Sequence, residues 1–199
     1  MKTNAFSTNA KFLEAQKTIF ARLTEKYSTE RKLEVDKLNE PVLWARNPDD
    51  VKILVKAFKL DDNLKVDFLS DLTAYDNQDG EDGAGRFVVV YQLYSTVLHT
   101  RIRIKCLINQ HQQVQTISDI FVGANWLERE VFDMYGISFA GHPNLRRILM
   151  DERFSGHPLR KEYPIKQREP FNNNIDFHLG ASPLSVENTV TVNAPEGEK

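Results

Sequence analysis

Apolar side chains recur at helical spacing in two stretches near the start of the chain. In residues 10–27 they stand three to four positions apart, and Asn9 is placed to act as the N-cap. The second stretch opens with Asn47 and Pro48, followed by two acidic residues that favour the start of a helix. Its apolar positions are Val51, Leu54, Val55 and Phe58. The pattern predicts two amphipathic helices.

Strand patterns dominate the middle of the chain. Residues 86–94 are almost continuously apolar and β-prone, which predicts a strand buried on both faces. Residues 99–108 alternate, and their cations on one face either contact solvent or receive an acidic partner. We expect these strands to form a hairpin through 95–98. Further strands are expected at 41–45, within 64–75 and within 109–118.

The segment between two expected strands, residues 76–85, is rich in glycine and acidic residues. Its carboxylates could bind calcium, although the spacing departs from that of an EF-hand loop. The alternative is a plain connection between strands.

A third helical pattern runs from about Gly123 to Tyr135, with apolar residues on one face. The order of helices and strands predicts an α+β fold with two layers, in which helices pack on a mixed, largely antiparallel sheet. We expect residues 1–138 to form this compact domain. Residues 139–199 are expected to form an extended partner-binding arm and a polar tail.

Charged residues are concentrated in the third helix, where Glu128, Arg129, Glu130 and Asp133 stand among large apolar side chains. Arg129 and Asp133 are four residues apart and could pair along the helix. Glu130 and Asp133 could act as an acid/base pair or as metal ligands. The alternative is that these charges lock the helix to neighbouring segments, because partly buried charges require partners.

After this helix the phrase Phe-x-Gly-His-Pro occurs twice, fifteen residues apart. The first copy contains His142 and is followed by Arg146 and Arg147; the second contains His157 and is followed by Arg160 and Lys161. A glycine before His-Pro permits positive φ, and proline favours an extended backbone in the residue before it, so each copy predicts a turn.

The segment from 139 to 164 lacks helical or strand periodicity, yet it contains more apolar residues than a disordered segment usually has. We interpret it as a segment that lies in a groove of another protein. Two other interpretations remain: an anion- or nucleic-acid-binding module built on the basic stretch 146–168, and catalysis by one of the two histidines.

The amino-acid composition excludes some of the possible classes of protein. A hydrophobic content of 41% and a charged content of 27% are typical of a soluble globular domain, and a net charge of -2 disfavours a bulk nucleic-acid binder. The single cysteine excludes a disulfide framework or a cysteine-ligated iron–sulfur cluster within the chain. No signal peptide or membrane span is evident, so we expect any membrane association to go through a partner.

The charged helix and the residues after it resemble the C subunit (NuoC family) of bacterial respiratory complex I, the proton-pumping NADH:quinone oxidoreductase. The family signature is matched by Glu128, Arg129, Glu130, Asp133, Met134, Tyr135, His142, Arg146, Ile148 and Leu149. A second hallmark is matched by residues 156–164, with Glu162 where the family usually has aspartate.

The resemblance implies a peripheral-arm subunit of a respiratory-chain translocase on the cytoplasmic side of the bacterial inner membrane. It implies no catalytic, metal or cofactor site in this chain, because NADH, FMN, iron–sulfur clusters and quinone belong to other subunits. It also implies packing on the D subunit, which holds the quinone site, close to the B subunit, with no nucleic acid as partner. The partner contacts would then be made by Glu128, Arg129, Glu130, Asp133, His142, Arg146, Arg147, His157, Arg160 and Lys161.

Overall fold

The computed structural model describes residues 4–164, with side chains at position 14 and from position 16 onward. The expected polar tail, 165–199, lies outside the described residues. The helices are α1 (Asn4–Tyr27), α2 (Pro48–Leu60) and α3 (Ala124–Tyr135). The strands are β1 (Leu33–Val35), β2 (Pro41–Trp44), β3 (Phe68–Asp76), β4 (Phe87–Ser95), β5 (Thr100–Ile108), β6 (Val114–Gln115) and β7 (Phe139–Ala140).

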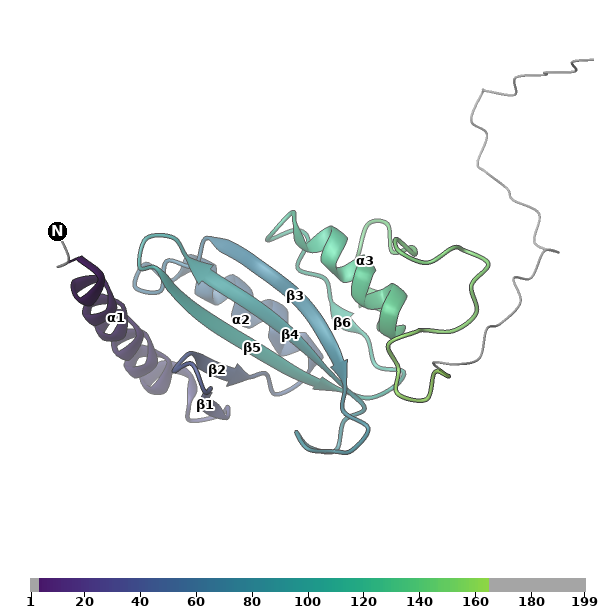
Figure 1. Cartoon of the computed structure of the whole chain (residues 1–199), viewed down its shortest axis with the longest axis horizontal. Helices are drawn as coiled ribbons and strands as arrows, with labels where there is room; N and C mark the ends of the chain where they lie inside the picture. The colour runs from purple at the N-terminus through teal and green to yellow at the C-terminus, as the bar shows by residue number, and fades with distance from the viewer. Residues whose placement is uncertain (1–3, 165–199) are drawn as a thin grey trace, which may run out of the picture.

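Five strands form the main sheet in the order β1-β2-β5-β4-β3. The β4–β5 hairpin pairs Phe87 with Ile108 at one end and Ser95 with Thr100 at the other, as the sequence predicted. Only the β2–β5 pair is parallel, so the sheet is mixed and largely antiparallel. The expected α+β fold is confirmed. Figure 1 shows α1 at one end of the molecule and α3 at the other.

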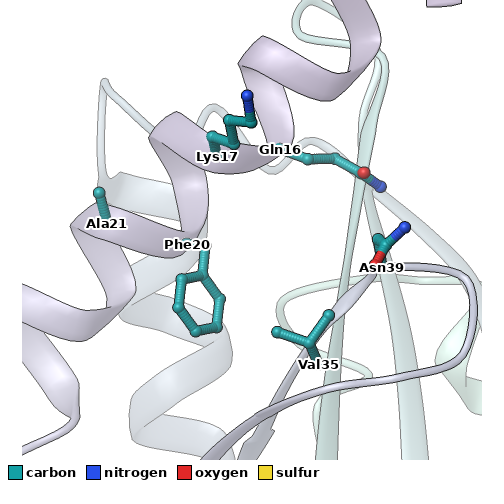
Figure 2. A pocket seen from close by; sticks show the side chains of 6 residues that line it. All are labelled: Gln16, Lys17, Phe20, Ala21, Val35 and Asn39. Carbon is teal, nitrogen blue, oxygen red and sulfur yellow. The ribbon is translucent and has the colours of Figure 1, made fainter.

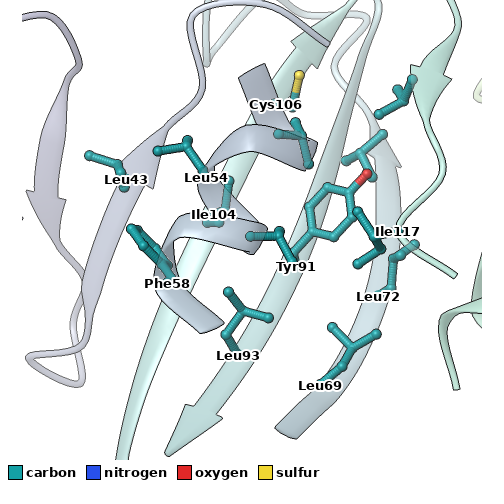
Figure 3. Packing of buried hydrophobic residues seen from close by; sticks show 14 of the residues in the cluster. Leu43, Leu54, Phe58, Leu69, Leu72, Tyr91, Leu93, Ile104, Cys106 and Ile117 are labelled. Carbon is teal, nitrogen blue, oxygen red and sulfur yellow. The ribbon is translucent and has the colours of Figure 1, made fainter. Parts of the chain in front are cut away.

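The hydrophobic core lies between one face of the sheet and the helices. Figure 3 shows Phe58 of α2 in the same cluster as Ile104 and Tyr91 of β5 and β4. Both strand residues are fully buried. On the same face Tyr27 of α1 meets Phe58 edge to face, with ring centroids 5.3 Å apart. Alternation along β4 and β5 places every second side chain in this core.

The opposite face of the sheet carries a small second cluster made of Trp44, Val88 and Val90. Strand β4 is therefore buried on both sides, as predicted. The cations of β5 find partners on this face within the chain. Arg103 donates to Asp36 at 2.7 Å, and the Lys105 ammonium lies 4.9 Å from the centre of the Trp44 ring.

Three details differ from the sequence predictions. Helix α1 begins at Asn4, so Asn9 lies inside it rather than at its cap. Strand β6 pairs in parallel with β7, a strand that the sequence did not predict, in a separate two-stranded sheet. The calcium interpretation of 76–85 is wrong, because within residues 4–164 no three carboxylates come together to hold a metal ion; Asp76 accepts from Arg86, and Asp82 accepts from the Tyr75 hydroxyl.

Candidate functional site

Helix α3 carries three charged side chains that are almost inaccessible to solvent. The exposed fraction is 0% for Glu128, 7% for Arg129 and 0% for Asp133, whereas Glu130 is exposed. Burial of a charge is costly unless a partner replaces the lost water. Each buried charge of α3 therefore identifies a segment that the helix holds in place.

Asp133 holds residues 147–150. Its Oδ2 accepts hydrogen bonds from three consecutive backbone N–H groups, those of Ile148 at 3.0 Å, Leu149 at 2.8 Å and Met150 at 2.8 Å. Its Oδ1 accepts from the Arg147 guanidinium at 2.6 Å. Burial alone would raise the pKa of Asp133, but these donors outweigh it and lower the pKa below its ordinary value. We call this group the Asp133 clamp.

Arg129 holds the same segment one turn earlier along α3. Its guanidinium donates to the carbonyl oxygens of Arg146 and Arg147, each at 3.1 Å. The guanidinium carbon also lies 5.1 Å from the centre of the Trp126 ring, in a cation–π arrangement. Two side chains of α3 thus bond the backbone of residues 146–150: Arg129 donates to two of its carbonyls, and Asp133 accepts from three of its N–H groups.

Glu128 and His142 join the start of α3 to the segments on either side. Glu128 accepts from the backbone N–H of Ile117 at 2.8 Å and from the Thr116 hydroxyl at 2.5 Å. Burial raises its pKa. His142 contacts the Asn125 carbonyl at 3.1 Å through Nε2, and its Nδ1 accepts from the backbone N–H of Asn144.

The second Gly-His-Pro phrase caps the end of α3. A helix leaves its last four carbonyls without partners in its own backbone. Here Gly136 donates to Phe132 O at 2.8 Å, and His157 Nδ1 lies 2.9 Å from Asp133 O. The backbone N–H of Leu159 donates to Met134 O at 3.1 Å, and Arg160 Nε donates to Tyr135 O at 2.6 Å.

Gly136 makes this cap sterically possible. Its φ of +73° is the left-handed conformation that favours glycine, and a Cβ there would collide with His157 and Arg160. Both Gly-His-Pro glycines also have positive φ, +79° at Gly141 and +88° at Gly156, as the sequence predicted.

Several interpretations of the charged residues are corrected by these contacts. Arg129 and Asp133 do not form the expected pair along the helix, because each is used by residues 146–150. Glu130 and Asp133 lie in different environments, since Glu130 is exposed and Asp133 is buried in the clamp. Both histidines contact backbone carbonyls of α3, His142 that of Asn125 and His157 that of Asp133.

The cations of the basic stretch are also mostly engaged within the chain. Arg147 binds Asp133, Arg153 binds Asp151 at 2.9 Å, and Lys161 contacts Asp79. Arg146 is exposed. An anion site between 146 and 164 would have to displace existing partners, which weakens that alternative.

Several large apolar side chains on α3 and in the residues after it are exposed to solvent. The exposed fraction is 61% for Leu149 and 52% for Leu159, and on α3 it is 61% for Trp126. Val122, just before α3, is 84% exposed. The sequence did not indicate that these side chains are exposed, because their exposure depends on how the residues after α3 pack against it. Exposed apolar side chains of this size are candidates for contact with another protein.

Within residues 4–164 no group of three or more His, Cys, Asp or Glu side chains is arranged to hold a metal ion. In that same part of the chain no helix combines the length and apolarity needed to cross a membrane.

The fold and this site define an α+β domain that holds a long irregular segment against one charged helix. The family model described as "Respiratory-chain NADH dehydrogenase, 30 Kd subunit" matches residues 45–169. That range includes most of the sheet, α3 and the clamped segment. The chain belongs to this family.

Similar proteins share a common name. The chain is 38% identical over 157 residues to the C subunit of NADH-quinone oxidoreductase from Geotalea uraniireducens, covering 77% of this chain and 92% of that protein. It is 44% identical over 117 residues to the C subunit of the same enzyme from Ruegeria sp., covering 59% of this chain and 57% of that protein. A C/D subunit from Bdellovibrio bacteriovorus is 39% identical over 121 residues, which is 61% of this chain and 21% of that protein.

Proposed function

We propose that this chain is a non-redox structural and assembly subunit of the peripheral arm of a proton-pumping NADH:quinone oxidoreductase. It packs on the D subunit, which holds the quinone site, and so supports electron transfer from NADH to quinone. It binds no cofactor itself; NADH, FMN, iron–sulfur clusters and quinone lie in other subunits. The B subunit and other members of the peripheral arm are further partners. The assembly lies on the cytoplasmic side of the bacterial inner membrane, which the chain reaches only through the complex.

The observation that carries this proposal is the Asp133 clamp. A buried carboxylate and a buried guanidinium fix residues 146–150, leaving Leu149 exposed. Burying these charges costs free energy of desolvation. In return the segment is already ordered, so it loses less conformational entropy when it binds a partner. It is suited to a preformed contact surface on another protein.

A similar protein supports the D subunit as that partner. The Bdellovibrio relative is named as a C/D subunit, so sequence similar to this chain occurs there within a longer protein named for both. Fusion of two subunits requires that they can lie next to each other. This supports the D subunit as the partner.

The motif residues divide into two roles under this proposal. Glu128, Arg129, Asp133, His142 and His157 position the segment, because their polar atoms are used within the chain. Arg147 and Arg160 act with them as parts of the clamp and the helix cap.

The direct contacts are made by exposed side chains. These are Trp126, Glu130, Arg146, Leu149, Leu159 and Lys161. Apolar and aromatic side chains supply the anchors, and charged side chains at the rim supply selectivity.

Co-expression with the D subunit tests the proposal. The full chain carries an affinity tag, and the yield of the co-purified D subunit is measured for wild type and for Leu149→Asp. Leu149 is 61% exposed, and Ile53 on α2 is 62% exposed, so Ile53→Asp is a matched control. We expect at least a tenfold loss for Leu149→Asp and no loss for Ile53→Asp. Equal recovery of the D subunit with both variants would contradict the proposed surface.

A further inference from the structure

A groove of about 500 Å³ lies between α1 and the β1–β2 hairpin, at the opposite end of the sheet from α3. Figure 2 shows Phe20 of α1 facing Val35 of β1 across it, and Gln16 facing Asn39 of the hairpin turn. Lys17 and Ala21 complete the lining. Val35 is 48% exposed, and Leu38 beside Asn39 in the same turn is 69% exposed. The groove is thus apolar at one end and carboxamide-lined at the other.

Gln16 is the unusual member of this lining. Its exposed fraction is 4%, yet in the described part of the chain neither its Oε1 nor its Nε2 has a hydrogen-bond partner. A buried amide without partners is costly and rare in folded proteins. Since one atom accepts and the other donates, the group that would satisfy both is another amide.

The β1 strand offers open backbone groups beside the groove. β1 is the terminal strand of the sheet and pairs only with β2 among the described strands. Trp44 N–H donates to Lys32 O, and Asp36 N–H donates to Glu40 O. Antiparallel strands alternate between residues that bond inward and residues that bond outward. The peptide groups of Leu33 and Val35 therefore face the open edge.

From these observations we infer that the groove binds an extended peptide segment of a partner protein. The segment adds to the edge of β1, its backbone pairs with Val35, and one of its peptide groups pairs with the Gln16 carboxamide. An apolar side chain of the segment lies between Phe20 and Val35. Strand addition with a pocket for alternate side chains is a common mode of peptide recognition.

The occupant is a peptide rather than a second copy of this chain or a compact small molecule. Two copies paired through β1 would meet along only the three residues Leu33–Val35, a contact much smaller than a stable dimer requires. A compact ligand would leave the open β1 edge unpaired. The inference does not rest on the assembly proposal, because the groove and the α3 surface lie at opposite edges of the sheet.

A phage-displayed library of random 12-residue peptides, selected on the immobilised full-length chain, tests this inference. The dissociation constant of the best peptide is then measured for wild type, Gln16→Leu and Val35→Pro. Proline at 35 removes an outward N–H and leaves the β1–β2 hydrogen bonds in place, since Val35 lies opposite Pro41 in a non-bonded pair. We expect each variant to weaken binding about tenfold. Ile53→Ser, on exposed α2 surface, should leave binding unchanged.

A second measurement does not depend on how the variants fold. N-methylation of the peptide at successive positions should weaken binding only at alternate residues, because only every second N–H would pair with β1. The inference is overturned if no peptide is selected, or if the selected peptides bind Gln16→Leu and Val35→Pro as tightly as wild type. Uniform tolerance of N-methylation, or sedimentation showing dimers that the same variants disrupt, would also overturn it.

Discussion

Arg147 and Asp133 form an ion pair of 2.6 Å in which the carboxylate is fully buried. The same carboxylate also accepts three backbone N–H groups. The pair is therefore the centre of a network that ties an irregular segment to a helix, rather than an isolated surface contact. Buried networks of this kind lose much more on removal of one member than exposed pairs do.

Replacing Asp133 with asparagine should lower the free energy of unfolding by about 3 kcal/mol, because one neutral acceptor cannot satisfy four donors. Urea denaturation measures the change. Glu130→Gln is the matched control on the same helix, and its effect should stay within about 0.5 kcal/mol because Glu130 is exposed. Equal effects of the two variants would show that the clamp contributes no special stability.

The Asp133 clamp should also be pH-dependent. The pKa of Asp133 is lowered in the folded chain, so its contribution is present above the unfolded pKa of about 3.9 and is lost as pH falls through the folded pKa. The stability difference between wild type and Asp133→Asn should therefore shrink below about pH 4. A difference that stays constant into acid would contradict the ionised clamp.

The contribution of Glu128 to folding stability should change with pH in the opposite direction. Burial raises its pKa, so the folded state holds the proton more tightly than the unfolded state. Stability from this group is greatest at low pH and falls as pH rises from about 4.3 through the folded pKa. Glu128→Gln can still accept from Ile117 but cannot ionise, so this variant should gain stability relative to wild type over that interval. Urea titrations at several pH values measure the difference.

Gly136→Ala should destabilise the fold by about 2–4 kcal/mol, since a Cβ at φ +73° is strained and would displace the cap formed by His157 and Arg160. Gly123, at the start of α3, has φ -61°, and a Cβ there would meet no atom within 4 Å. Gly123→Ala should therefore be neutral or stabilising by about 0.4–1 kcal/mol. Thermal or urea unfolding measures the stability of each variant relative to wild type.

Gln16→Leu should raise the free energy of unfolding of the isolated chain by about 1–2 kcal/mol, because it removes a buried amide that has no hydrogen-bond partner among the described residues. The exposed Gln110 provides a control, and Gln110→Leu should change stability by less than about 0.5 kcal/mol. A variant that is more stable yet binds peptide less well would separate a recognition role for Gln16 from a folding role. Loss of stability in Gln16→Leu would contradict this account.

The parts of the structure that could be predicted from sequence are those set by local rules. Asn47 accepts from Asp50 N–H as an N-cap, and alternation along β5 separates core from cations, because both effects act within a few residues. The two glycines before His-Pro adopt positive φ for the same reason.

For the site, the sequence predicts which residues take part but not which groups they bond. The sequence identifies the charged residues of α3, but the partners of Asp133 lie 14 to 17 residues away along the chain, in a segment without periodicity. Hence local spacing predicts an Arg129–Asp133 pair where a longer-range network exists. One signal was present: α3 has no basic residue in its last turn, so its terminal carbonyls required donors from elsewhere.

Hydroxyl-radical footprinting of the full chain, free and bound to the D subunit, tests the central proposal most directly. Mass spectrometry measures side-chain oxidation residue by residue. We predict that Trp126, Leu149 and Leu159 become protected in the complex, while Ile53 and Leu38 react equally in both states, since all five are exposed in the free chain. Unchanged oxidation of Trp126, Leu149 and Leu159 in a complex that has formed would contradict the assignment of this surface to the D subunit.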